Sequence, residues 1–178
     1  MAIKATIFKA ELNIADMDRH YYGDHSLTIA RHPSENDERM MVRLLAFALS
    51  ASEALTFTRG ISTEDEPDLW QKNLNGEIEL WIDLGQPDEK RIRKACARAK
   101  QVIIYCYQPR SAPVWWKQLE KKLTRFENLS VYNLADDMAS QLGALSSRNM
   151  QLQCTIQDGE IWFSSGEQSV NITLEKWK

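Results

Sequence analysis

The stretch that decides the fold is residues 67–85, which reads Pro-Asp-Leu-Trp-Gln-Lys-Asn-Leu-Asn-Gly-Glu-Ile-Glu-Leu-Trp-Ile-Asp-Leu-Gly. Near its centre stands Asn75-Gly76, and this dipeptide is the strongest short signal for a β-hairpin. The segments on either side are rich in β-prone side chains. The sequence therefore predicts one strand over 67–72 and a returning strand over 78–84.

The register of this hairpin follows from its turn. If Asn75 and Gly76 alone form the loop, each residue before it faces a defined residue after it. The predicted partners are Lys72 with Glu79, Trp70 with Trp81, and Asp68 with Asp83, all on one face because side chains alternate along a strand. The first two pairs stabilise a hairpin, whereas two aspartates that face each other repel.

The facing aspartates predict a metal site. Opposed carboxylates either raise one pKa or recruit a cation. Carboxylate oxygens suit Mg²⁺ or Mn²⁺, so we expect Asp68 and Asp83 to hold one such ion. The alternative is that each aspartate is a solvated end of its strand.

Helices and strands alternate on the C-terminal side of the hairpin. The sequence predicts a basic helix over 89–100 with Asp88 as its N-cap, an apolar strand over 101–107, a helix over 114–128 opened by Ser111 and Pro113, a strand over 129–133, a helix over 135–145, and an antiparallel meander over 149–156, 160–164 and 169–175. The wholly apolar run is typical of a strand covered on both faces, as in a parallel arrangement.

The N-terminal side adds strands and one helix. We expect a strand over 3–14, a turn at Tyr22-Gly23-Asp24, a strand over 25–30, a helix after Pro33 with Ser34 as N-cap, and a β-prone segment over 54–58. This order predicts a mixed α+β fold. A length of 178 residues suits a single domain that spans residues 1–178.

Two resemblances refine this prediction. Pro67-Asp68, a hairpin, and then a strand that ends in an acid resemble the core of the PD-(D/E)xK nucleases. The whole chain, including residues 65–70 and 81–87, resembles the YaeQ family of bacterial proteins, which has that nuclease-like fold. The resemblance implies a restriction-endonuclease-like core (αβββαβ) with additional N-terminal strands and a C-terminal antiparallel meander.

The same resemblance implies site residues. Asp68 matches the first acid and Asp83 the second, but the lysine position two residues later is Gly85, which departs from the pattern. In this superfamily the lysine can move to the following helix. The remaining candidates are Lys94, or alternatively Lys90, for the lysine; Glu38, or Glu35 one turn earlier, for an optional acid on the first helix; and Gln86 and Glu79 as lesser metal ligands.

Composition limits the partners. The net charge is −3, so the chain has no global attraction for nucleic acid and needs a local basic surface or bridging metal ions to bind it. Cys96, Cys106 and Cys154 are too few and too widely spaced for a zinc site or a disulfide framework. No apolar stretch is long enough to span a membrane and no signal peptide pattern stands at Met1, so we expect a cytoplasmic protein.

Two functions remain open from the sequence. The first is a metal-dependent nuclease in which Asp68 and Asp83 hold Mg²⁺, Lys94 positions the attacking water, and Glu38 assists. The second is a catalytically lapsed nuclease-fold module that binds nucleic acid or a protein partner. The facing aspartates favour the first, whereas Gly85 and the acidic net charge favour the second.

Overall fold

The computed structural model describes residues 4–59 and 65–178, and these divide into two compact units. The N-terminal unit comprises the chain up to Ala51 together with Asp137–Thr173, and the central unit comprises Ser52–Asp136 together with Leu174–Lys178. The predicted mixed α+β class is confirmed. Ile3, the predicted start of the first strand, lies outside the described residues, and the single domain over 1–178 stays a prediction.

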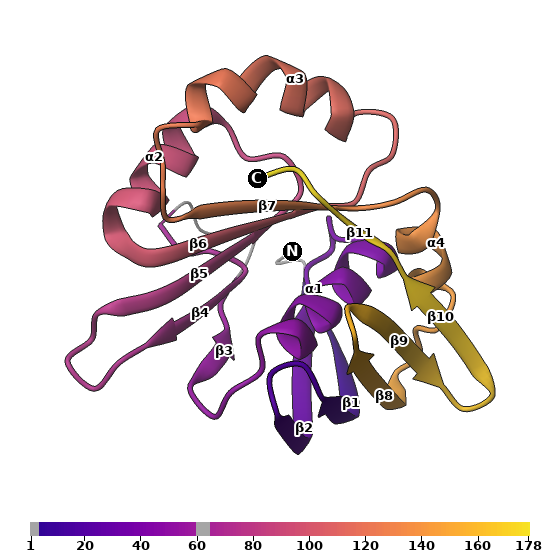
Figure 1. Ribbon diagram of the computed structural model, residues 1–178. Coiled ribbons are helices and arrows are strands. Elements are labelled where there is room, and N and C mark those ends of the chain that lie inside the picture. Colours follow the sequence, from indigo (N-terminus) through magenta and orange to yellow (C-terminus); the bar gives the residue numbers. More distant parts are fainter. Residues whose placement is uncertain (1–3, 60–64) are drawn as a thin grey trace. The chain divides into compact units, whose positions relative to one another are not determined.

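The N-terminal unit is built on a sheet with the strand order β10-β9-β8-β1-β2. Its strands are β1 (Thr6–Asp16), β2 (Tyr21–Arg31), β8 (Asn149–Gln157), β9 (Glu160–Ser165) and β10 (Gln168–Ile172). β1 runs antiparallel to β2 and parallel to β8, so the predicted C-terminal meander joins the N-terminal hairpin in one sheet (Figure 1).

Two helices belong to the same unit. α1 (Asp37–Leu49) is buried along most of its length, and its N-cap is Asn36, whose side chain accepts the Arg39 N–H at 2.8 Å. The predicted cap at Ser34 was therefore wrong, because Asn36 supplies a better-placed acceptor for the free N–H groups of the first turn. α4 (Met138–Gly143) packs on α1, where a Cβ at Gly143 would lie 2.9 Å from Glu38 Cγ.

Two other predicted boundaries in this part of the chain were wrong. Tyr22–Asp24 is no turn: β2 starts at Tyr21, and the tight connection falls on Met17–His20, where His20 has a φ of 57°. The predicted strand over 169–175 is two strands, β10 and β11 (Leu174–Lys176), which belong to different sheets. An alternating pattern does not reveal where a chain changes its partner strand.

The central unit holds the sheet with the order β11-β7-β6-β5-β4-β3. Its other strands are β3 (Leu55–Phe57), β4 (Leu69–Lys72), β5 (Ile78–Leu84), β6 (Ala99–Cys106) and β7 (Leu129–Leu134). β3, β4 and β5 are antiparallel, whereas β5, β6 and β7 are parallel, as the apolar run in β6 predicted.

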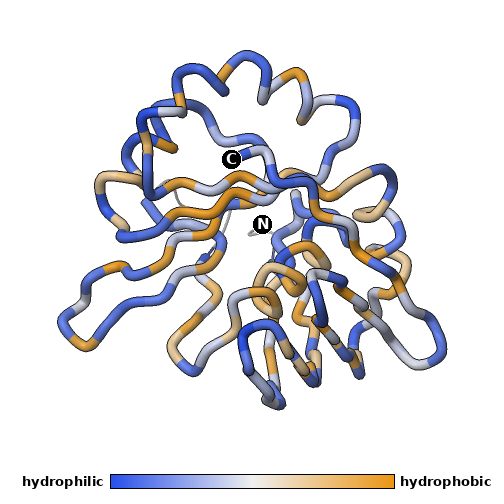
Figure 2. Tube along the Cα trace, in the orientation of Figure 1, coloured by the Kyte–Doolittle hydropathy of each residue, from blue (hydrophilic) through white to orange (hydrophobic). Residues whose placement is uncertain are grey.

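Two helices cover one face of this sheet, α2 (Glu89–Arg98) and α3 (Ala112–Leu123) (Figure 1). α2 has the predicted N-cap, since Asp88 accepts the Arg91 N–H at 2.8 Å. Ile92 and Ala95 of α2 and Leu123 of α3 pack against apolar side chains of β5, β6 and β7. The central strands are mostly orange and the helices largely blue in Figure 2, as expected for a sheet whose helices face water on their outer side.

The deciding hairpin differs from prediction at its turn. Asn73 N–H donates to Glu77 O at 2.9 Å and Gly76 has a φ of 82°, so the loop is Leu74-Asn75-Gly76, a three-residue turn closed by a left-handed glycine. Lys72 consequently pairs with Ile78, and the register shifts before Gln71 pairs with Leu80. The predicted Lys72–Glu79 pair was therefore wrong, whereas the Trp70–Trp81 pair is confirmed, with ring centroids 6.3 Å apart.

A three-residue turn and a two-residue turn predict different effects of substitutions at Asn75 and Gly76. Gly76→Ala should lower the free energy of unfolding by about 1 kcal/mol, because a side chain is disfavoured at positive φ. Asn75→Ala should change it by less than about 0.5 kcal/mol, because Asn75 has no positive φ here. Urea unfolding of both variants checks this. Equal losses would instead support a two-residue turn, which requires positive φ at both positions.

Candidate functional site

Asp83 lies near the end of β5, and its carboxylate is bound by Arg91 of α2. Arg91 Nε lies 2.9 Å from Asp83 Oδ2, and Nη2 lies 3.0 Å from Oδ1, so the pair is bidentate. The geometry follows from local structure: Asp83 shares a strand face with Trp81, which packs under α2, and Arg91 stands in the first turn after Asp88. Asp83 is only 3% exposed, and its two oxygens face a planar cation.

Further contacts fix the guanidinium. Arg91 Nη2 also donates to the Glu66 carbonyl oxygen at 2.9 Å, and the guanidinium carbon lies 5.9 Å from the Trp81 ring centroid. Burial raises the pKa of Asp83, and the hydrogen bonds and charge of Arg91 oppose that rise. The same partnership raises the pKa of Arg91 against the effect of its own burial. The ion pair thus joins β5, α2 and the segment before β4.

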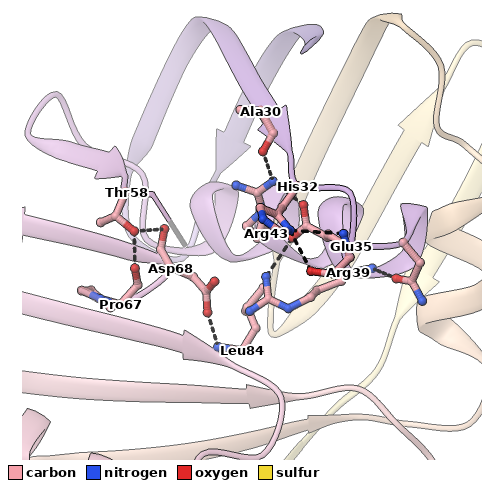
Figure 3. Close-up of polar contacts among 11 residues, drawn as sticks. Ala30, His32, Glu35, Arg39, Arg43, Thr58, Pro67, Asp68 and Leu84 are labelled. Carbon is pink, nitrogen blue, oxygen red and sulfur yellow. Dashed lines mark hydrogen bonds and ion pairs between the residues drawn. The ribbon is translucent and has the colours of Figure 1, made fainter. Parts of the chain in front are cut away.

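Asp68 is also buried, but its carboxylate has a different partner. β4 begins one residue later, and Asp68 N–H donates at 3.0 Å to the carbonyl oxygen of Ile82, the residue that Leu69 faces. Asp68 Oδ2 accepts the backbone N–H of Leu84 at 2.9 Å (Figure 3). The side chain thereby satisfies a strand N–H that β4 does not reach, and the Asp68–Asp83 pair is absent from the ladder of β4 and β5 in the described residues.

The two aspartates still influence each other. The charge of Asp68 contributes to the raised pKa of Asp83 and to the raised pKa of Arg91. The sequence argument that two neighbouring carboxylates require a cation therefore keeps its force. In this structure the cation is the guanidinium of Arg91.

The donor set does not fit a resident Mg²⁺ or Mn²⁺ in this conformation. Both oxygens of Asp83 accept N–H groups of Arg91, and one oxygen of Asp68 accepts a backbone N–H. Within residues 4–59 and 65–178, no group of three or more His, Cys, Asp or Glu side chains could hold a metal ion. A divalent ion at this place would compete with Arg91 for the lone pairs of Asp83.

The other predicted residues of the central unit lie around this pair. Gly85, at the motif's lysine position, has a φ of 89° and donates its N–H to Tyr105 O at 2.8 Å. Gln86 donates to Gln108 at 2.8 Å and to Ser111 at 2.6 Å, which joins two loops. Glu79 accepts Lys100 Nζ at 2.9 Å, and this hydrogen bond lowers the pKa of Glu79. Glu79 thus forms an ion pair with Lys100 and not with Lys72, its predicted partner.

The two acids predicted for the first helix belong to the N-terminal unit, but only Glu38 lies in α1, because Glu35 precedes the Asn36 cap. Glu38 lies against Gly143 of α4. Glu35 is buried and accepts Arg39 Nη1 at 2.8 Å and Arg43 Nη2 at 2.6 Å, a network shown in Figure 3. Glu35 therefore has two arginine partners of its own.

A pocket of about 360 Å³ opens beside the ion pair. It is lined by Asp65, Trp81, Asp88, Lys90, Arg91, Lys94 and Arg98. Lys94 and Lys90, the predicted replacement lysines, are exposed here, and within the described part of the chain neither makes a hydrogen bond or an ion pair. Lys94 and Arg91 thus line the same pocket, and Arg91 in turn binds Asp83, which is not one of the lining residues.

Arg91 is the residue that the sequence reasoning missed. Arg91 is one of several basic residues on this helix, and the pattern around it is that of any solvated amphipathic helix. The available signal was the position of Arg91 in the first turn of α2, just after the Asp88 cap. This helix is the next element after β5, whose second-last residue is Asp83.

The thiols and the helices carry less functional information. Cys96, Cys106 and Cys154 are free, and burial raises the pKa of the Cys106 and Cys154 thiols to about 12 and that of Cys96 to about 11. Such thiols are poor nucleophiles near neutral pH.

Among the described residues, no helix has the length and apolar character needed to cross a membrane.

Comparisons with a family model, with individual relatives and with solved structures all match proteins named YaeQ. The family model described as YaeQ protein matches residues 1–174. The uncharacterized proteins YaeQ of Salmonella typhi and Escherichia coli are 51% and 49% identical over 178 residues, which is 100% of this chain and 98% of each relative. The crystal structure of YaeQ from Xanthomonas axonopodis is similar with a TM-score of 0.95 at 49% identity, covering 98% of both chains. That from Pseudomonas syringae has a TM-score of 0.93 at 33% identity, covering 98% of this chain and 96% of that one.

Removing one partner of the Arg91–Asp83 ion pair should strongly lower the free energy of unfolding. Arg91→Met should lower the free energy of unfolding by about 3 kcal/mol, because it leaves a buried carboxylate without a partner. Arg93→Met, on the exposed side of the same helix, is the matched control and should cost less than about 0.5 kcal/mol. In the double variant Arg91→Met/Asp83→Asn the loss should be smaller than the sum of the single losses. Equal losses for Arg91→Met and Arg93→Met in urea unfolding would contradict this account.

The pKa of Asp83 predicts a pH dependence. A folded-state pKa above the ordinary 3.8 means that the folded protein holds this proton more tightly than the unfolded chain. Asp83 therefore adds stability at low pH and loses that contribution as the pH rises through its folded-state pKa. In urea unfolding from pH 7 downward, the wild type should gain stability relative to Asp83→Asn. A loss of stability relative to Asp83→Asn would show that Arg91 lowers the pKa of Asp83 more than burial raises it.

Proposed function

The chain belongs to the YaeQ family, and we propose that it is a catalytically lapsed nuclease-fold module that binds nucleic acid. In this proposal Arg91 occupies the place at Asp83 that a divalent ion takes in a PD-(D/E)xK nuclease. The bidentate ion pair between Arg91 and Asp83 is the observation that carries the proposal.

The element order supports a relation to that nuclease core. Along the chain, α1 is followed by β3, β4 and β5, then by α2 and β6, which is the order αβββαβ. β3, β4 and β5 pair antiparallel, and β6 pairs parallel to β5. Asp68 stands just before β4 and Asp83 near the end of β5, the positions where the two acids of the motif are expected.

The chemistry of the ion pair explains the loss of hydrolysis. A catalytic metal ion needs carboxylate lone pairs and open positions at which it binds and acidifies a water molecule. A guanidinium uses the same lone pairs, but it has no coordination site and cannot be deprotonated in a protein. Gly85 at the motif's lysine position removes a second catalytic group.

The exposed cations of α2 favour nucleic acid as the partner. Lys90, Arg93 and Lys94 are exposed, and in the described segments none of them makes an ion pair or a hydrogen bond. By contrast, Lys122 and Arg125 approach Glu89 at 3.7 and 3.8 Å, so the neighbouring basic residues are partly compensated. Unpaired cations on one helix provide the local basic surface that a chain of net charge −3 needs.

A metal-dependent nuclease remains the second candidate. The observation in its favour is that the charge of Asp68 acts on Asp83, so two carboxylates lie within electrostatic reach of each other. Asp68 and Asp83 would then hold Mg²⁺ or Mn²⁺ after Arg91 moves away, with Lys94 in an assisting role. The two candidates differ in what divalent ions do to the protein.

One experiment separates them. Thermal shift with Mg²⁺ and with Mn²⁺ is combined with cleavage and anisotropy assays on labelled single-stranded and duplex DNA and RNA. We expect no metal-dependent stabilisation, no cleavage, and binding that weakens steeply with salt. Lys94→Gln should reduce the salt slope by about one, whereas Lys9→Gln, an exposed lysine of β1, should leave it unchanged.

Two outcomes would contradict the proposal. Cleavage that requires Mn²⁺ or Mg²⁺ and is lost in Asp83→Asn would establish the nuclease instead. Failure to bind any of the four nucleic acids at low salt would remove nucleic acid as the partner.

A further inference from the structure

The pocket beside the ion pair carries an excess of positive charge. Four of its lining side chains are cationic, Lys90, Arg91, Lys94 and Arg98, and two are carboxylates, Asp65 and Asp88. If the charge of Asp83 is taken to neutralise that of Arg91, the three remaining cations still outnumber the two lining acids. One of those acids is already engaged, since Asp88 accepts the Arg91 backbone N–H as the N-cap.

The cations form a stripe along α2. Lys90, Lys94 and Arg98 are four residues apart, so successive side chains lie on one helix face about 6 Å apart along the axis. Like charges at this spacing destabilise a helix unless something neutralises them. Arg98 donates one N–H to the Asp65 carbonyl oxygen at 2.8 Å and keeps further donors, and no carboxylate in the described residues pairs with Lys90 or Lys94.

Trp81 supplies an apolar side of the pocket. The residue is 2% exposed, and the Arg98 guanidinium carbon lies 5.2 Å from the centroid of its ring. The buried indole N–H interacts with the Asp83 carboxylate and lowers the pKa of Asp83, so this donor is directed at Asp83. The polar groups that the pocket offers a ligand are therefore those of the basic side chains.

We propose that this pocket binds a phosphomonoester group. Such a group carries between one and two negative charges near neutral pH and presents three acceptor oxygens on one side. Lys90 and Lys94 supply two unpaired ammonium groups, and Arg98 supplies its remaining guanidinium N–H groups. A terminal phosphate offers three oxygens to these three cationic side chains, whereas a phosphodiester offers only two unesterified oxygens.

The phosphate has two possible sources. It can end a nucleic acid strand, in which case this inference rests on the proposed function, or it can belong to a small free phosphomonoester. A volume of about 360 Å³ falls in the range of small-ligand sites, so it accommodates either.

The test uses calorimetry and anisotropy on the full chain. The probes are inorganic phosphate, a nucleoside 5′-monophosphate, dimethyl phosphate, and one oligonucleotide with either a 5′-phosphate or a 5′-hydroxyl. The pocket variant is Lys90→Gln/Lys94→Gln. The control is Arg93→Gln, which removes one charge from the same helix but does not line the pocket. Circular dichroism and thermal unfolding establish that each variant is folded.

We expect the monophosphate to bind about tenfold more tightly than dimethyl phosphate, and the pocket variant to lose that preference. A 5′-phosphate that tightens oligonucleotide binding in the wild type and in Arg93→Gln, but not in the pocket variant, assigns the phosphate to a strand end. Binding of the free monophosphate without any oligonucleotide binding supports the pocket and defeats the proposed function.

Two results overturn the inference. One is that no phosphate compound binds at moderate salt. The other is that the pocket variant weakens 5′-phosphate and 5′-hydroxyl oligonucleotides equally, which would leave nucleic acid binding intact as a function but make the pocket an ordinary part of a phosphodiester surface.

Discussion

The ion pair between Asp83 and Arg91 is the constraint on which the central unit depends. A carboxylate that is 3% exposed loses its hydration and requires a hydrogen-bonded cation in return. Arg91 meets this need with two N–H groups and donates a third bond to Glu66 O. The end of β5, the first turn of α2 and the segment before β4 are therefore held together by one side chain. The Trp81 ring lies next to the same guanidinium and provides an apolar contact surface for it.

This arrangement has a functional consequence. In the proposed function, the acids that hold an exchangeable ion in a PD-(D/E)xK nuclease instead bind a guanidinium, which is covalently part of the chain and always charged. The neutralising charge is thus built into the fold and leaves no position for a reactive water. What remains on the surface is a set of uncompensated cations along α2, which suits binding of phosphate groups better than their hydrolysis. In the proposed function, Asp68 and Asp83 serve stability, and the cations of α2 serve recognition.

Local sequence signals predicted much of the fold. β5 was predicted over its full range, and Asp88 as the cap of α2, because an apolar β-prone run and a capping aspartate act within a few residues. The errors arose where a choice depends on more distant structure. Asn75-Gly76 fits a two-residue or a three-residue loop equally well as a sequence, and the longer loop alone moves Lys72 away from Glu79. The partner of Asp83 was not predicted, because the position of Arg91 just after the Asp88 cap gives only its place in the helix. Which residue of the first turn reaches Asp83 depends on how α2 lies over β5.

The most direct measurement is a crystal structure of the chain soaked in Mn²⁺, with the anomalous signal recorded at the manganese edge. The account predicts that Arg91 stays bidentate on Asp83 and that no anomalous peak lies between Asp83 and Asp68. A peak coordinated by both carboxylates, with the Arg91 guanidinium displaced, would contradict it.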